Sequence, residues 1–141
     1  MFSEKSKIPD ELFSNPHILK SLIDYQNGSV VSRSILKRES GNITLFAFDK
    51  GEGLSEHTSP FDAVVYICDG EAEIKISGSI FNLNEGDMIV MPANEPHALK
   101  AASRFKMLLI MLKKWKNCQF FFTEYLSKLI YLISETLIEI G

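Results

Sequence analysis

Hydrophobic and polar residues alternate along the middle of the chain in short runs that turn residues separate. The run from Glu71 to Ile76 places Ala72 and Ile74 on one face and charged residues on the other, which is the period-two pattern of a strand. Other short apolar runs predict strands at 30–36, 43–48, 63–67, 79–83, 88–91, 97–100 and 105–112. Short strands with closely spaced turn signals predict an all-β sandwich or barrel over residues 29–112.

Two of these runs carry more detailed expectations. Asp69 and Gly70 separate two strand-like runs, and glycine tolerates the positive φ of a tight turn, so we expect a two-residue hairpin there. Along 43–48 both faces are apolar, with Leu45 on one and Phe46 on the other. Such a strand is covered on each side, by a second sheet or by a partner chain.

The two ends of the chain differ from this middle section. In the lead-in, residues 1–28, apolar residues recur at helical spacing between Pro16 and Tyr25, which predicts a short helix. In the tail, residues 113–141, a basic step precedes a strongly apolar stretch from Phe120 to Ile140. The charges within that stretch fall in one narrow helical sector, which predicts an amphipathic C-terminal helix and not a membrane span.

Three interpretations of the tail are open. The helix packs against the barrel or against a dimer mate, which is the interpretation we favour. Alternatively it touches a membrane surface, a role for which Trp115 and the neighbouring lysines are suited. In the third interpretation the tail comes from a shifted or extended reading frame and has no evolved role.

Composition and charge exclude several classes of protein. A chain of 141 residues is long enough for one domain with a sizeable core, so folding needs neither disulfides nor a metal. The net charge of −3 gives no electrostatic reason to expect nucleic acid as a partner. Cys68 and Cys118 form no disulfide framework, and the first residues lack the apolar core of a secretory signal. We therefore expect a cytoplasmic protein in which Cys68 is an inert core thiol.

Two stretches with similar organisation each carry one histidine near a turn. His57 lies in the stretch 51–70 and His97 in the stretch 86–101. Each stretch is predicted to be a strand, a turn and a second strand, so we expect the two rings to converge at the barrel mouth. A pocket with an apolar lining and a few convergent polar groups is the default binding site of a small protein.

In the first of these stretches the sequence resembles the cupin superfamily, and in particular its small, single-domain bacterial members. The first cupin motif is a glycine, five residues, His-x-His, three or four residues, a glutamate, six residues and a glycine. Gly51, His57 and Gly70 match it in register. Ser59 stands at the position of the second histidine, and Ala63 at the position of the glutamate.

The second motif supports the same resemblance. Gly86, Pro92 and His97 match its glycine, proline and histidine, while Asn94 replaces a glycine and Ala101 an asparagine. The resemblance covers roughly residues 41–112 and implies the double-stranded β-helix, or jelly-roll barrel, of the cupins. Because cupins often pair through their N-terminal strands, it also implies a homodimer.

The resemblance implies a metal at the histidines, but with an incomplete set of ligands. Metal-binding cupins use three histidines and one glutamate, so one divalent ion (Fe, Mn, Ni or Zn) would be held here by His57 and His97. In the alternative, the two rings are hydrogen-bonded polar groups in a pocket without metal. Asp62 lies one residue before the glutamate position, and would face away unless a bulge near Pro60 turned it.

Two functions follow from these expectations. The first is a small-molecule-binding protein whose pocket includes His57, Ser59 and His97, with no defined reaction and no assigned catalytic residue. The second is a metal-dependent cupin enzyme, such as a dioxygenase, decarboxylase or isomerase of a small organic acid or phenolic compound. Ser59 would hydrogen-bond the ligand or a metal-bound water. Some methionines of the apolar runs are expected to fill the core and others to line the cavity, namely Met88, Met91, Met107 and Met111.

Overall fold

The computed structural model describes residues 10–114, so the tail helix expected at 120–140 lies outside the described residues. Two short 3-10 turns, η1 (Asp10–Leu12) and η2 (Leu19–Leu22), come first. No helix within residues 10–114 is long and apolar enough to cross a membrane. All other regular elements are strands, which confirms the all-β prediction: β1 (Val30–Arg38), β2 (Gly41–Phe48), β3 (Gly53–His57), β4 (Phe61–Ile76), β5 (Ser79–Asn84), β6 (Met88–Met91), β7 (His97–Lys100) and β8 (Phe105–Lys113).

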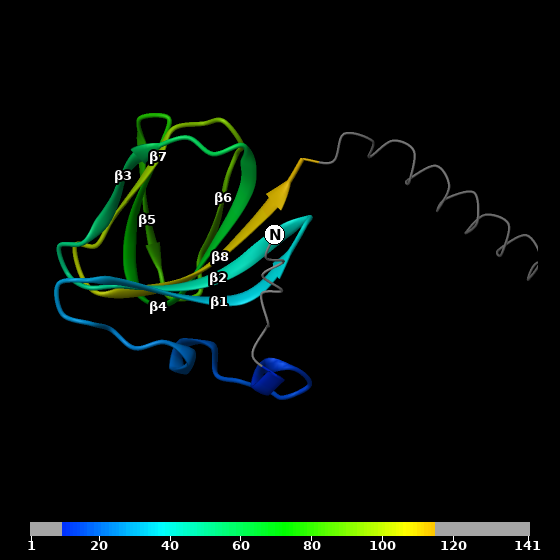
Figure 1. Cartoon of the computed structure of the whole chain (residues 1–141). Coiled ribbons are helices and arrows are strands. Elements are labelled where there is room, and N and C mark those ends of the chain that lie inside the picture. Colours follow the sequence, from blue (N-terminus) through cyan, green and yellow to red (C-terminus); the bar gives the residue numbers. More distant parts are fainter. Residues whose placement is uncertain (1–9, 115–141) are drawn as a thin grey trace, which may run out of the picture.

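Strand β4 is the centre of the sheet. The strands pair in the order β1-β2-β8-β4-β7-β3, and β5 and β6 also pair with β4. All of these pairings are antiparallel. Figure 1 shows the sheet curling into a barrel, with the two 3-10 turns outside it next to β1. The long β4 contributes to both sides of this barrel, because it pairs with β6 and β8 near its start and with β5 and β7 near its end.

The hairpin predicted at Asp69 and Gly70 is wrong. The chain does not reverse there, and β4 runs on through a bend at which its register with β8 shifts between Ile67 and Asp69. Gly70 has a φ of 74°, and a Cβ added to it would collide with the carbonyl oxygen of Arg104. Glycine at this position therefore allows β4 and the start of β8 to approach closely within a bulge, whereas the sequence alone indicated a turn.

The main core fills the interior of the barrel. The predicted alternation in the second half of β4 is confirmed, since Ala72 and Ile74 are buried while Glu71 is exposed. Phe48 and Phe105 are fully buried, and their rings stack with centroids 4.5 Å apart. Around them lie apolar side chains from several strands, including Val65, Ile67, Leu83, Leu99 and Met107.

Residues 10–28, the part of the lead-in that the structure describes, cover part of the outer face of the sheet. Leu45 and Ala47 point outward from β2, and they are buried in a second cluster with Ile23 and Cys68. The expected covering of both faces of this strand is therefore confirmed, although the cover comes from the lead-in. The short helix predicted from Pro16 to Tyr25 is present only as the four-residue 3-10 helix η2, because Ile23 is already extended. An extended segment lays its apolar side chains flat on the sheet, where packing outweighs helical periodicity.

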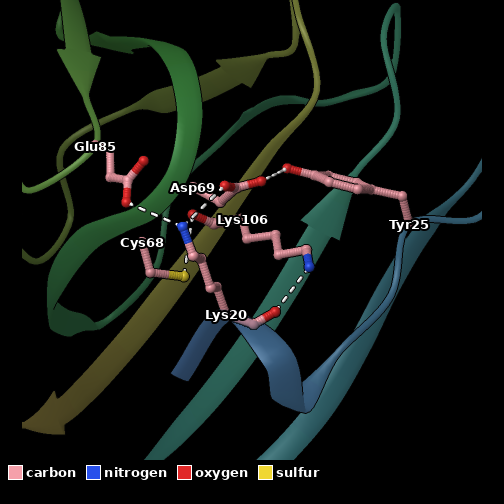
Figure 2. A network of polar contacts seen from close by, with 6 residues as sticks. All are labelled: Lys20, Tyr25, Cys68, Asp69, Glu85 and Lys106. Carbon is pink, nitrogen blue, oxygen red and sulfur yellow. Dashed lines mark hydrogen bonds and ion pairs between the residues drawn. The ribbon is translucent and has the colours of Figure 1, made fainter. Parts of the chain in front are cut away.

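Polar contacts at the edge of this cluster join residues 20–25 to the barrel strands and the loop after β5 (Figure 2). The Tyr25 hydroxyl donates a hydrogen bond of 2.6 Å to Asp69. The Lys106 ammonium donates one of 2.7 Å to the Lys20 carbonyl and lies 4.8 Å from the centre of the Tyr25 ring. Lys20 in turn forms ion pairs with Asp69 and Glu85. The buried charge of Lys106 thus has both a carbonyl and an aromatic face as partners, as a buried cation requires.

Candidate functional site

A cavity of about 280 Å³ opens at one end of the barrel. Most of its lining is apolar and comes from the inward faces of β3, β4, β6, β7 and β8. The polar side chains in the lining are those of His57, Thr58, Ser59 and His97, and the apolar lining comprises Leu54, Pro60, Ala63, Met91, Leu99, Met107, Leu109 and Met111. An apolar lining with a few convergent polar groups is typical of the pockets in which proteins bind small molecules.

His57 and His97 meet in this cavity. They are direct partners in the pairing of β3 with β7, and their ring centroids are 4.4 Å apart in an edge-to-face arrangement. His97 is buried, with 5% of its surface exposed, whereas His57 lies at the exposed rim. The structure thus brings together the two histidines and Ser59 on one cavity, and their binding role stays a prediction.

Both rings are held in the same way by the backbone. The Nδ1 atom of His57 lies 2.8 Å from the Ser55 carbonyl oxygen, and that of His97 lies 3.0 Å from the Glu95 carbonyl oxygen. Because a carbonyl oxygen only accepts hydrogen bonds, each Nδ1 carries the proton and donates it. In the neutral form of each ring the unshared electron pair is therefore on Nε2, where it can accept a hydrogen bond or bind a metal.

Two loops are tied together at the mouth. The Asn94 amide donates to the Ser59 carbonyl oxygen at 2.7 Å, and the Ala93 amide donates to the Asp62 carboxylate at 2.9 Å. These bonds hold the loop that precedes His97 against the segment that follows His57. Asn94 has a φ of 65°, a left-handed conformation that asparagine tolerates, so it can stand at the glycine position of the motif.

The carboxylates near the site do not point into it. Asp62 is used by the loop amide and does not line the cavity, and Glu56 forms an ion pair with Lys75 at 3.7 Å. Within residues 10–114, no group of three or more His, Cys, Asp or Glu residues could hold a metal ion. The residues present therefore do not fit the three-histidine, one-glutamate site for a divalent ion, because Ser59 and Ala63 supply neither an imidazole nor a carboxylate.

The methionines of the lining are functional candidates whose orientation the sequence left open. Met91, Met107 and Met111 line the cavity, whereas Met88 is 57% exposed on the outer face. Ala63 is the direct partner of Met91 on one side and of Met111 on the other. Alternation along each strand separates these methionines into two faces, Met88 on one face of β6 and Met91 on the other. Which face points inward is decided by the tertiary structure.

Comparisons with known proteins agree with this architecture. The sequence model of the cupin domain matches residues 44–112. A conserved protein of unknown function from Streptococcus pyogenes is 38% identical, with 72% of this chain and 90% of the other covered, at a TM-score of 0.69. A cupin superfamily protein from Desulfitobacterium hafniense is 34% identical over 72% and 93% of the two chains, at a TM-score of 0.68.

A third similar structure comes from a longer protein. A cupin 2 conserved barrel domain protein from Leptotrichia buccalis is 40% identical, at a TM-score of 0.66. The similarity covers 67% of this chain and 46% of the other. No curated protein matches the chain.

Proposed function

The chain belongs to the cupin family, and from this premise we propose that it binds a small molecule in the cavity at the barrel mouth. The observation that carries the proposal is the pair of imidazole rings with centroids 4.4 Å apart in an otherwise apolar lining. The body of the ligand would contact the apolar side chains, and its polar group would contact His57 and His97. We assign no reaction to the site.

The size of the cavity limits the ligand. A volume of about 280 Å³ lies near the lower end of the roughly 300–1,000 Å³ that ligand pockets span. A single aromatic ring or a short aliphatic chain with one polar group suits this volume. Larger cofactors such as dinucleotides do not.

The polar end of the cavity selects the chemical class. A neutral imidazole accepts a hydrogen bond at Nε2 from a hydroxyl group, and a protonated one donates a hydrogen bond to a carboxylate. Ser59 at the same end adds a hydroxyl that both donates and accepts. Phenols and small carboxylic acids match this set of partners.

The alternative expectation, a metal-dependent cupin enzyme, has less support. It needs ligands that Ser59 and Ala63 do not supply, and the nearby carboxylates of Glu56 and Asp62 are engaged elsewhere. The imidazoles are also oriented by backbone carbonyls, so no acid stands behind either ring as in a general-base pair. Binding without an assigned reaction therefore agrees better with the geometry.

The test is ligand-induced stabilisation of the purified protein. Thermal unfolding is measured with benzoate, hexanoate, phenol and catechol, and hits are followed by isothermal titration. At a free ligand concentration of 100 times Kd, the native state gains about 2.7 kcal/mol. We expect at least one compound of the panel to raise the unfolding temperature of the wild type.

Matched variants locate the binding. His57→Gln with His97→Gln removes both imidazoles of the cavity, while His17→Gln alters an exposed histidine of the lead-in, which lies outside the cavity lining. The stabilisation should disappear in the double variant and persist in the control. The proposal fails if no compound of the panel stabilises the wild type, or if the double variant responds equally.

A further inference from the structure

We propose that this cavity is a site for the soft monovalent ion Cu(I), bound by Nε2 of His57, Nε2 of His97 and the thioether sulfurs of Met91 and Met111. This inference rests on the proposed function, because it uses the same cavity and the same two imidazoles. It departs from the divalent site that the family resemblance implies, since it uses methionine sulfur where that site uses a carboxylate.

The placement of the two methionines follows from the register of the sheet. Ala63 on β4 lies directly between Met91 on β6 and Met111 on β8. Residues directly opposite on antiparallel strands share one face, with Cβ atoms about 5 Å apart. All three residues line the cavity. The short side chain of Ala63 thus leaves a gap at the glutamate position of the motif, and a thioether stands on each side of that gap.

The loops place the row formed by Met91, Ala63 and Met111 at the same end of the barrel as the histidines. Met91 is the last residue of β6 and His97 the first of β7. The loop between them is tied to the segment after His57 by the bond from the Asn94 amide to the Ser59 carbonyl oxygen. The nitrogen and sulfur donors therefore gather around one mouth, whereas Met107 lies four residues deeper along β8.

The chemistry of the donors selects the ion. Imidazole and thioether are ligands that Cu(I) accepts, whereas Mg²⁺, Ca²⁺ and Mn²⁺ prefer oxygen. Every donor of the proposed set is neutral, and no carboxylate lines the cavity. A dication in this apolar surrounding would keep twice the uncompensated charge of Cu(I), and burying uncompensated charge is costly. The same lining that disfavours a divalent metal thus favours a monovalent one.

The histidines are already oriented for ligation. In metal sites a ligating imidazole usually donates its other ring N–H to a carbonyl or carboxylate, which fixes the tautomer and the ring orientation. Both rings here make such a bond, to the carbonyls of Ser55 and Glu95. Their Nε2 atoms therefore need no tautomeric rearrangement before they bind an ion.

The test is an anaerobic competition for Cu(I) between the protein and bicinchoninate. It is carried out in a Cys118→Ser background, because a thiolate there would compete for the ion. Cys68 is common to all variants, and it is buried in the outer cluster away from the cavity. We expect the protein to withdraw about one equivalent of Cu(I), in keeping with a single cluster of imidazole and thioether donors.

Leucine substitutions remove sulfur while preserving apolar volume, so the fold should be retained. Met91→Leu with Met111→Leu should weaken Cu(I) binding by about tenfold or more. Met88→Leu alters a methionine that is 57% exposed on the outer face and does not line the cavity, so it should leave the affinity unchanged. Copper-edge X-ray absorption should detect sulfur at bonding distance in the wild type and lose it in the double variant.

Two results would overturn the inference: a wild type that takes no Cu(I) from bicinchoninate, and a double leucine variant that binds Cu(I) as tightly as the wild type. Measuring ligand stabilisation in the absence of copper separates this inference from the proposed function. If the protein takes up no Cu(I) but benzoate or phenol still stabilises it through the histidines, only the copper site is refuted. If neither copper nor any compound of the panel binds, both are refuted.

Discussion

Backbone carbonyls orient both histidines of the cavity, each from the residue two positions before the ring. A carboxylate in that place would add a negative charge and make the imidazole more basic. A carbonyl fixes the ring and the tautomer without that charge. The two Nε2 atoms are therefore the ring nitrogens left free to accept, and both the proposed ligand binding and the proposed Cu(I) binding depend on them.

Among the carboxylates of residues 10–114, Asp49 is the one whose pKa is held clearly below its usual range. Its carboxylate accepts a hydrogen bond from the Gly28 amide at 2.7 Å and another from Arg104 at 2.6 Å. Both partners favour the ionised form, so the Gly28 amide first, and then Arg104, lower the pKa of Asp49. The carboxylate thereby joins the turn before β1 to the loop before β8.

The sign of the pH dependence follows from this lowered pKa. The stabilisation is fully present above the pKa of an unfolded aspartate, about 3.9, and is lost as the pH falls through the lower folded pKa. Asp49→Asn should therefore destabilise the protein at pH 7 by more than it does at pH 3. Urea unfolding at both pH values measures the difference. Asp24→Asn, at an exposed carboxylate of the lead-in, is the control, and an equal effect of Asp49→Asn at both pH values would contradict the prediction.

Among the elements, β4 decides the shape of the barrel. It pairs with β5, β6, β7 and β8. One strand can reach all four because it bends at Gly70, where a hairpin would have ended it. The bend needs both a positive φ and close contact with the backbone of β8. Only glycine meets both conditions without strain.

A pair of glycine variants separates these two conditions. Gly70 and Gly78 both have positive φ, at 74° and 86°, but nothing lies within 4 Å of a Cβ added to Gly78. Gly78→Ala should cost about 1–2 kcal/mol for the left-handed backbone alone. Gly70→Ala should cost clearly more, because the strands must also separate. Denaturant unfolding measures both, and equal losses would show that steric contact with β8 is unimportant.

On the scale of the whole molecule, residues 10–28 of the lead-in pack on the barrel and form part of its outer layer. It buries the outward side chains of β2 together with Cys68, and the contacts of Tyr25 and Lys106 close its edge (Figure 2). Burial, followed by the hydrogen bond to Asp69, raises the pKa of Tyr25, so its hydroxyl stays protonated and donates. We therefore expect the segment around Tyr25 to detach from the sheet more often when its hydrogen bond to Asp69 is removed.

Cys68 reports on that opening. Burial raises the pKa of its thiol, and a protonated, covered thiol reacts slowly with alkylating agents. Tyr25→Phe removes the hydrogen bond to a charged partner, at a cost of about 1.5–3 kcal/mol, and should accelerate alkylation of Cys68 by iodoacetamide in a Cys118→Ser background. Tyr66→Phe, at a partly exposed tyrosine outside this network, is the control. An unchanged alkylation rate in Tyr25→Phe would mean that apolar packing alone holds the lead-in.

The amino-acid sequence by itself determined the all-β class, the inward residues of the second half of β4 and the pairing of two histidine-bearing stretches. These features depend on the alternation of side chains along one strand and on short motifs. Both are properties of residues close together in the sequence. The departures of Ser59 and Ala63 from the cupin motif are also visible in the sequence itself. They already indicated that a divalent site would lack ligands.

Only the tertiary structure decided the rest. Whether Gly70 closes a hairpin or bends a strand depends on β8, which lies 35 residues further along the chain. Whether Met91 and Met111 face the cavity depends on which face of β6 and β8 turns inward, and this is set by strands distant in sequence. Helix formation in residues 16–25 stops after η2 because an apolar sheet surface is there to receive Ile23 in an extended conformation. In each case a non-local contact outweighs a local preference, so the chemistry available at the mouth became definable only in the folded chain.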